Sequence, residues 1–471
     1  MRPRLLSAAM ATIALGVMSA LPGPVLAGPP GTWTVISGGG VTNINEPGVY
    51  RTADGTLHVA MHRESNNLDY IDVGHITESG KLTGRTDAIG GWESAAHDPV
   101  LVGSPDGGMR MVFGGIRSLD QADPYIAGYL WQSASPADGL AWTLSPQPAV
   151  TANTGYASSG SGATTLPDGT LVAAYPQGDT IYYQVGANAP LSFDVPDCCA
   201  YHMTLAQDAG VVYAAWYANG DGEPNMGQFV RTIYPTLGPV MKVPGSSDTF
   251  SGNPGALDPS QHVAMTTRNG GGVYIAFCQG YPSCDSVRLW RVGAGKALTL
   301  PGSEDASHVS ISPAPSGRFW IAFDDTSDNL HAVRTNTTAK KFGAVRTIKR
   351  PQQGDDSYHI WIEGTRARAD LLYNDGDDIW HQQIFAGLTL KASPGKWNGD
   401  KSVAVEFKVT DAGDGVKGAT VKAKWNGQKL TCKTEDNGKC TIHFPKLGKN
   451  TIKVTAKKSG YAPDEIKLKV S

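Results

Sequence analysis

The sequence predicts an all-β chain, a seven-bladed β-propeller followed by a small β-sandwich domain. Composition is the first reason: 57 glycines and 30 prolines, with frequent Val, Thr, Tyr and Trp, favour strands and tight turns over helices. A strand, turn, strand pattern that recurs along most of the chain is the second. The third is a change in the sign of the net charge near residue 400, which indicates a second domain.

The repeat defines the predicted blades. Seven segments of 17 residues align without gaps, and they begin at Glu46, Asp98, Gly160, Tyr201, His262, His308 and Ser357. Six carry Gly at the tenth position, as a tight turn between two strands favours, whereas the seventh has Arg366 there. A third alternating segment follows each, such as "NLDYIDV" and "TIYYQVG". Successive segments begin 41 to 62 residues apart, the range of a four-stranded blade, so seven blades are predicted between about residues 31 and 395.

The first 27 residues are predicted to be a secretory signal peptide. Arg2 and Arg4 precede an apolar stretch that ends in Val25, Leu26 and Ala27, so the mature chain is expected to begin at Gly28. No later segment has the roughly 18 consecutive apolar residues of a membrane span. We therefore expect a secreted, extracellular monomer without a membrane span.

The six cysteines form three close pairs in sequence, which predicts local disulfides in an oxidising compartment. The pairs are Cys198 with Cys199, Cys278 with Cys284, and Cys432 with Cys440. The last pair is symmetric about Asp436 and is predicted to bridge a hairpin. The adjacent pair is predicted to make a rigid rim beside His202; the alternative is that each of these two cysteines pairs elsewhere or stays reduced.

Charge divides the chain in two. Residues 401–471 hold 15 lysines, no arginine and 7 acidic residues, a net charge of +8, whereas residues 28–400 hold 23 basic and 36 acidic residues, a net charge of −13. We predict a propeller over residues 28–395 and a lysine-rich sandwich over residues 396–471. The basic domain could favour an acidic glycan or a cell wall, and the alternative is a solvated lysine face. A nucleic-acid partner is not expected.

The propeller prediction also places the candidate site. Because the first strand of each blade lines a central channel, residues at the start of these strands converge on one face. The loops after the second strands reach the same face. The residues predicted there are Glu46, Arg63, His97, Asp98, Arg117, Tyr156, Tyr201, His202, His262, His308, Tyr358 and His359.

Imidazole and phenol groups are suited to proton transfer at a sugar, and arginine is suited to neutralising a uronate carboxylate. The predicted catalytic residues are His97, Tyr201, His202, His308, Tyr358 and His359. The predicted substrate-binding residues are Glu46, Arg63, Asp98, Arg117 and His262. A glycosidase would instead need two carboxylates, and Glu46 with Asp98 is the pair that first strands offer.

Other roles remain open for these residues. Converging histidines could hold a metal, so Ca²⁺ or another divalent ion is a candidate cofactor, although none is required by the sequence. The acidic stretches "DGDG", "DDTSDN" and "NDGDD" lack the spacing of a twelve-residue calcium loop. Each histidine could also simply bond backbone at the mouth of the channel.

Two family resemblances accompany these patterns. The stretches "ADGTLHVAMHRESNNLDYIDV" and "LPDGTLVAAYPQGDTIYYQV" resemble repeats of the sialidase-like (BNR-type) propeller superfamily. That resemblance implies a propeller. A true sialidase would also have six blades, an arginine triad and a short sequence box that ends in Trp; the stretch "SPDGGMRM" lacks this Trp. The stretches "TDAGDGVKGATV" and "TEDNGKCTI" resemble bacterial Ig-like and carboxypeptidase-regulatory-like modules, which implies an Ig-like sandwich that positions or attaches its neighbour.

The functional expectation is a secreted, carbohydrate-active propeller. The leading hypothesis is a lyase that cleaves an acidic, uronate-containing polysaccharide by His and Tyr proton transfer, because seven-bladed secreted polysaccharide lyases resemble this chain better than sialidases do. The alternatives are a noncatalytic propeller that binds a glycan or cell wall, and a sialidase-like glycoside hydrolase.

Overall fold

The computed structural model describes residues 31–37, 46–92, 94–125, 128–152, 160–196, 199–219, 225–246, 262–280, 284–327, 329–351 and 359–471. The predicted signal peptide lies outside these ranges. Within them the chain is all-β as predicted: apart from one 3₁₀ turn at Pro315–Gly317, every regular element is a strand. No helix of the described part is long and apolar enough to cross a membrane.

The described residues before residue 386 form seven four-stranded antiparallel sheets, numbered here in chain order. The first is β2 (Gly48–Arg51), β3 (Leu57–Ser65), β4 (Leu68–Ile76) and β5 (Leu82–Trp92); the second is β6 (Ser94–Gly103), β7 (Met109–Ile116), β8 (Tyr129–Ser135) and β9 (Thr143–Leu144). The third is β10 (Gly162–Thr165), β11 (Leu171–Gln177), β12 (Thr180–Val185) and β13 (Leu191–Asp194); the fourth is β14 (Ala200–Asp208), β15 (Val211–Asn219), β16 (Met226–Tyr234) and β17 (Met241–Lys242). The fifth is β18 (Met265–Thr267), β19 (Val273–Gln279), β20 (Ser286–Arg291) and β21 (Leu298–Thr299); the sixth is β22 (Ala306–Ala314), β23 (Arg318–Asp325), β24 (Asn329–Arg334) and β25 (Arg346–Lys349). The seventh is β26 (His359–Gly364), β27 (Arg368–Asn374), β28 (Ile379–Phe385) and β1 (Thr34–Val35).

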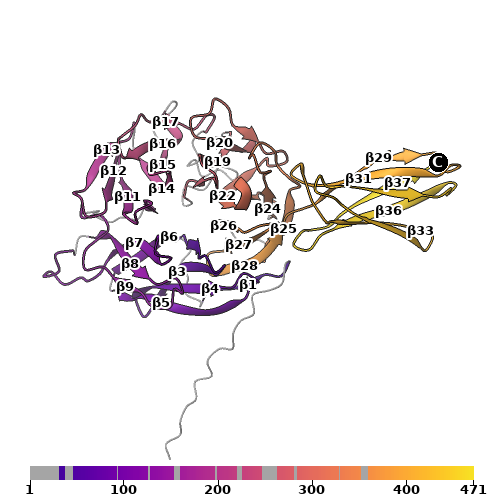
Figure 1. The fold of residues 1–471 in the computed structure, drawn as a ribbon. Coiled ribbons are helices and arrows are strands. Elements are labelled where there is room, and N and C mark those ends of the chain that lie inside the picture. The colour runs from indigo at the N-terminus through magenta and orange to yellow at the C-terminus, as the bar shows by residue number, and fades with distance from the viewer. Residues whose placement is uncertain are drawn as a thin grey trace, which may run out of the picture.

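The sheets follow one another around a ring, indigo through orange in Figure 1. The apolar core lies between neighbouring sheets: one cluster joins the first and second sheets, and the next joins the second and third. A cluster that includes Leu57 and Val59 with Leu372 and Ile379 joins the seventh sheet back to the first. Because each sheet buries both faces against its neighbours, the arrangement is consistent with a β-propeller.

The ring closes through the N-terminal strand. β1 supplies the outer strand of the seventh sheet, where Thr34 pairs with His381, and the amide of Ile36 donates to Ile379 at 2.8 Å. Ile36 is fully buried. The repeat pattern did not reveal this exchange, because a two-residue strand carries no periodic signal of its own.

The predicted turn glycines have a physical cause. All six repeat glycines have φ between +72° and +96°, the left-handed region that L side chains rarely adopt. Those glycines are Gly55, Gly107, Gly169, Gly210, Gly271 and Gly317. The prediction of a tight glycine turn between the first two strands is therefore confirmed for these six segments.

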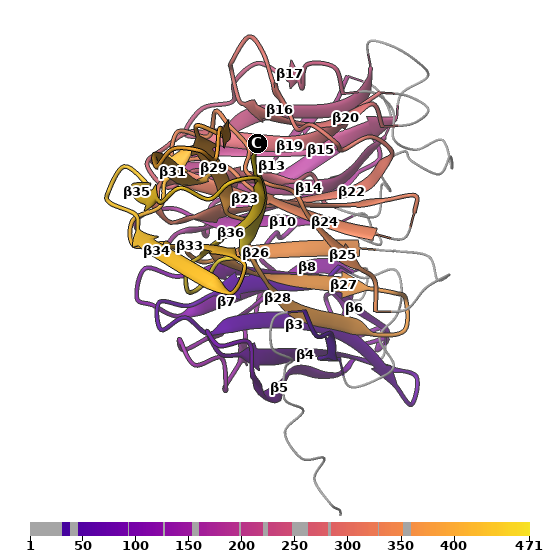
Figure 2. The ribbon, with the colours of Figure 1, turned by 90° about the vertical axis from the view of Figure 1, so that its right-hand side faces the viewer.

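Beyond residue 386 the strands form two further sheets around a separate core. One contains β29 (Thr389–Ser393), β31 (Val403–Asp411), β32 (Asp414–Gly415) and β35 (Lys439–Phe444); the other contains β30 (Lys396–Trp397), β37 (Asp464–Val470), β36 (Asn450–Lys457), β33 (Thr420–Trp425) and β34 (Gln428–Lys433). Phe407, Trp425 and Phe444 are buried between them. Figure 1 shows these sheets, in yellow, extending away from the ring, and Figure 2 views the chain from their side.

Buried ion pairs and main-chain bonds join the ring to these two sheets. Arg334 lies 3.0 Å from Asp411, which is 1% exposed, and Arg318 lies 2.6 Å from Asp414. The amide of Ala462 donates to the carbonyl of Ala386 at 2.9 Å. The two parts therefore meet through a polar, hydrogen-bonded contact as well as through the chain.

Two of the predicted disulfides are present, Cys278 with Cys284 and Cys432 with Cys440. The hairpin expected for the second pair is wrong, however. Cys432 lies in β34, which pairs with β33, whereas Cys440 lies in β35, which pairs with β31. The turn around Asp436 sends the chain from one sheet to the other, so this disulfide ties the two sheets together.

Candidate functional site

A cavity of about 690 Å³ runs along the inner strands of the ring. Its walls come from the first strand of every one of the seven sheets and from the residues just before those strands. This is the central channel that the sequence predicted. Its lining is mostly small and aliphatic, as at Val49, Ala163 and Val263.

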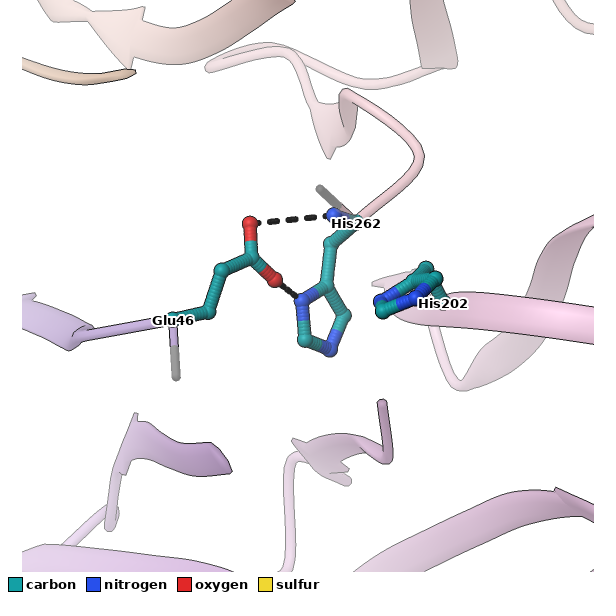
Figure 3. Close-up of side chains that lie close together, drawn as sticks. All are labelled: Glu46, His202 and His262. Carbon is teal, nitrogen blue, oxygen red and sulfur yellow. Dashed lines mark hydrogen bonds and ion pairs between the residues drawn. The ribbon is translucent and has the colours of Figure 1, made fainter. Parts of the chain in front are cut away.

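Three predicted residues lie close together, as Figure 3 shows, and two of them, Glu46 and His262, line the channel. One donor atom each from Glu46, His202 and His262 lies within 4.8 Å of the others. Nδ1 of His262 contacts Oε2 of Glu46, and the backbone amide of His262 donates to Oε1 at 3.0 Å. The His202 ring stands edge-on to the His262 ring, with centroids 6.0 Å apart. Three separate sheets thus bring these side chains together.

A fourth predicted residue, Asp98, positions the backbone of Glu46. The Oδ1 atom of Asp98 accepts a hydrogen bond from the backbone amide of Glu46 at 3.3 Å, and Asp98 is 6% exposed. Asp98 therefore fixes the start of the first inner strand; its side chain acts on the backbone of Glu46.

His202 is aimed by a β-bulge. The pairing of β14 with β15 shifts between Tyr201 and Thr204, and His202 itself has φ of +41°. A bulge bends a strand and re-aims one side chain, at a backbone cost that L residues rarely carry without a reason. Gly160 packs against this kink, since a Cβ there would lie 2.7 Å from Nδ1 of His202.

The same device recurs in alternate sheets. The inner strand β6 shifts register between His97 and Val100, and β22 shifts between Ala306 and Val309. Asp98, inside the first of these bulges, has φ of +49°. The second, fourth and sixth sheets therefore each kink at the entrance of the channel, at the position where the repeat places histidine.

Nδ1 of His262 and the carboxyl group of Glu46 face one another across a position that a proton or a cation can occupy. Nε2 of His262 lies 2.6 Å from the carbonyl oxygen of Ser161, which can only accept, so Nε2 carries a proton. Burial lowers the pKa of His262 to about 4, against the raising effect of the bond to Ser161. The ring is therefore neutral near pH 7, and the lone pair of Nδ1 faces the carboxyl group of Glu46.

Either a proton or a metal ion can occupy that position. With a proton, Glu46 is the carboxylic acid that donates to Nδ1. With a metal, the imidazole that bonds a carbonyl through its other nitrogen has the usual geometry of a metal-ligating histidine. Two imidazoles and a carboxylate favour Zn²⁺ over Ca²⁺, because Ca²⁺ takes oxygen ligands.

His308 is placed in a separate buried group. Its Nδ1 lies 3.0 Å from Oδ2 of Asp324, and its backbone amide donates to Oδ1 at 2.7 Å. Arg350 approaches the same carboxylate at 3.2 Å. His308 and Asp324 are 3% and 0% exposed. His308, which was predicted to be catalytic, therefore belongs to this buried group and not to the cluster of Glu46, His202 and His262.

The other predicted catalytic residues either are not among the three residues of the cluster or lie outside the described part of the chain. His359 is fully buried, with its ring centroid 5.3 Å from that of Trp361. Tyr201 is half-buried and packs against the core of the fifth sheet. Tyr358, Tyr156, Cys198 and the side chain of His97 lie outside the described residues. Cys199 is disulfide-bonded.

The two predicted arginines pair within their own sheets. Arg63 donates to Asp72 at 2.8 Å and lies 4.2 Å from the ring centroid of Tyr70. Arg117 makes hydrogen bonds of 2.9 Å and 3.2 Å to Asp123. The structure therefore does not bring either arginine into the cluster of Glu46, His202 and His262.

Sequence reasoning missed two polar residues inside the channel. Glu363 lines the cavity, accepts from Ser312 at 3.0 Å, and has its pKa raised to about 7 by burial. Tyr50 lines it as well, and burial followed by the charge of Glu363 raises its pKa. Gly103 makes room for Tyr50, since a Cβ there would overlap the phenol. The available signal was a carboxylate at an inward position of "HIWIEG".

No family model matches the sequence, and no curated protein matches it. Solved structures with related folds include an inactive variant of virginiamycin B lyase from Staphylococcus aureus with quinupristin, 12% identical with a TM-score of 0.45 over 75% of this chain and 98% of that one. A polysaccharide lyase is 10% identical, with a TM-score of 0.45 over 75% and 91%. A Trypanosoma rangeli sialidase is 10% identical, with a TM-score of 0.38 over 90% and 84%. Fold similarity of this order does not assign a function, which must come from the residues of this chain.

Proposed function

We propose that the protein is a secreted polysaccharide lyase that cleaves an acidic, uronate-containing glycan at the channel end formed by Glu46, His202 and His262. The observation that carries the proposal is the convergence of these three titratable side chains, which lie at or just before the first strands of three different sheets; two of them, Glu46 and His262, line the cavity. Groups that exchange protons within hydrogen-bond reach of a common substrate are what eliminative cleavage requires.

In the proposed step, His202 takes the proton from the carbon next to the uronate carboxylate, and a carbon–carbon double bond forms as the bond to the glycosidic oxygen breaks. The pair of Glu46 and His262 supplies a proton to the leaving oxygen. The pair is suited to this because the carboxyl group of Glu46 and Nδ1 of His262 are in contact and both side chains have low solvent exposure.

We also propose the arrangement around this site. The seven sheets are the blades of a seven-bladed propeller, and the C-terminal sheets are an Ig-like module. The pairing of β29 with β31 supports a boundary between them before Thr389, upstream of residue 395. Secretion after cleavage behind Ala27 is supported by the two disulfides, which form in oxidising compartments.

The test is turnover of the full mature chain on polygalacturonate and alginate, followed by the ultraviolet absorbance of the unsaturated product. We expect the wild type to produce it, and we expect His202→Ala and Glu46→Gln to lower kcat by about 10² to 10⁴, the usual value of a positioned proton-transfer group. His443→Ala is the matched control, since His443 is exposed on β35, far along the chain from the cluster.

Other outcomes separate the alternatives. New reducing ends without unsaturation would identify a hydrolase instead. Binding to a glycan panel without any cleavage, unchanged in a variant that carries His202→Ala and His308→Ala, would overturn the lyase proposal in favour of a noncatalytic glycan-binding propeller.

A further inference from the structure

One outer surface of the C-terminal sheets is dominated by lysine. In β33, β34, β36 and β37 alternate residues point away from the core, as the alternation of buried and exposed positions along each strand shows. We call this surface the lysine face. Its lysines are Lys422, Lys424, Lys429, Lys433, Lys453, Lys457, Lys467 and Lys469.

Strand register lines up four of these lysines in one row. Lys424 pairs with Lys429 on one side and with Lys453 on the other, and Lys453 pairs with Lys467. Adjacent strands are about 4.8 Å apart, and like charges directly opposite one another destabilise a sheet. The charges of Lys424, Lys429 and Lys457, with the first of these the largest influence, lower the pKa of Lys422.

One acidic group on the lysine face neutralises one of the four charges of the row. All four strands are described, and Glu465 is the one acidic side chain among their outward positions; it pairs with Lys453 at 2.7 Å. The remaining outward positions of the three longest rows are threonines, such as Thr420, Thr431 and Thr455. Lys424, Lys429 and Lys467 have no acidic partner among the outward positions of these strands. Three like charges that folding does not need indicate a partner that supplies the opposite charge.

The chemistry of the surface restricts that partner. The charges of the lysine face repeat along and across the strands, and its outward positions carry neither arginine nor an aromatic side chain. Phosphate and nucleic-acid sites favour arginine forks and stacking platforms, which are missing from these strands. Repeated ammonium groups suit a polymer that presents a carboxylate on successive residues.

We propose that the lysine face docks a linear acidic polysaccharide, whose carboxylates bind the row of Lys429, Lys424, Lys453 and Lys467. The surface is separate from the channel of the ring, so it would hold the polymer while the ring works on another part of it. The polymer class rests on the proposed function, but the binding does not depend on catalysis at Glu46, His202 or His262.

The test is affinity electrophoresis of the full mature chain in gels that contain polygalacturonate, at low and at physiological salt. A variant that carries Lys424→Gln, Lys453→Gln and Lys467→Gln should lose at least tenfold in affinity. The retardation of the wild type should fall steeply as salt rises, because binding releases counterions. Binding is measured without turnover. A chain that binds the polymer but does not cleave it would therefore support docking on the lysine face and contradict the proposed lyase activity.

The matched control removes the same charge from the other sheet. Lys391, Lys408 and Lys439 also pair with one another across strands, so a triple Gln variant at these positions changes net charge and cross-strand repulsion equally. We expect it to stay within twofold of the wild type. Equal loss in both variants, no retardation of the wild type, or tighter row-dependent binding to duplex DNA or anionic vesicles would each overturn the proposal.

Discussion

The position between Nδ1 of His262 and the carboxyl group of Glu46 determines what the site can do. The bond from Nε2 to Ser161 fixes the tautomer, and burial keeps the ring neutral, so the position is reserved for one positive group. A proton there makes Glu46 an acid close to the channel. A metal there would remove that acid.

Zn²⁺ should therefore bind at this position and compete with the proton. At a concentration about 100-fold above Kd, a ligand that binds only the folded chain adds about 2.7 kcal/mol to the free energy of unfolding. We expect Zn²⁺ to raise Tm and to inhibit the proposed cleavage. In His262→Ala the rise should disappear, whereas in His443→Ala it should stay. Equal rises in all three proteins would show that the ion binds elsewhere.

The sequence predicted which residues lie at the site better than it predicted how their side chains are oriented. The repeat pointed to Glu46, His202 and His262 because it marked the starts of the inner strands. It could not show that bulges aim His202 and displace Asp98 behind Glu46, because a bulge is one extra residue without a composition of its own. For the same reason it grouped His308 with the cluster, although Asp324 holds that ring in a buried pair.

At the scale of single elements, the two middle strands of the first sheet contain a buried histidine pair. Nδ1 of His58 on β3 lies 3.0 Å from Nδ1 of His75 on β4, and Thr52 and Thr86 bond the other nitrogens. Burial, and then the charge of His75, lowers the pKa of His58 to about 4, and burial also lowers the pKa of His75. Both rings are thus held neutral in the fold.

This pair should make the fold less stable in mild acid. Below about pH 6.5 the unfolded chain binds protons at both histidines while the folded chain does not, so stability falls as the pH drops toward about 4. We expect His58→Gln to reduce the loss between pH 7 and pH 5 by about 2 kcal/mol, in urea unfolding at both values. His443→Gln serves as the control, and an unchanged loss in His58→Gln would contradict the prediction.

The sequence predicted elements well where the backbone demands a particular residue or period. Glycine turns and alternating strands are local, and all six glycine turns were found. The pairing of β1 with β28, and the pairing of the strand of Cys440 with β31, depend on contacts between segments far apart in the sequence. Neither therefore has a local sequence signature. The outer strand of the seventh sheet and the course of the second disulfide could for that reason be found only in the structure.

For the whole molecule, the ring depends on a very short closing strand. Ile36 is fully buried in the cluster that joins the first and seventh sheets, beside Leu57 and Ile379. Ile36→Ala should lower the free energy of unfolding by about 2 to 4 kcal/mol, the cost of a buried cavity. Leu140→Ala, at a leucine that is 61% exposed, should change it by less than about 0.5 kcal/mol. Equal unfolding midpoints for the two variants in urea would show that β1 does not close the ring.

The pairing of β1 with β28 also sets an order of events during synthesis. β1 is made at the start of the described chain, but its partner strand is made only after six complete sheets. A chain that emerges N-terminus first must therefore wait, with its first strand unpaired, until almost the whole ring has left the ribosome or the export channel. Completion of the ring is in this way a check that synthesis has passed β28, and products that stop before Ile379 carry an open seam that proteases can recognise.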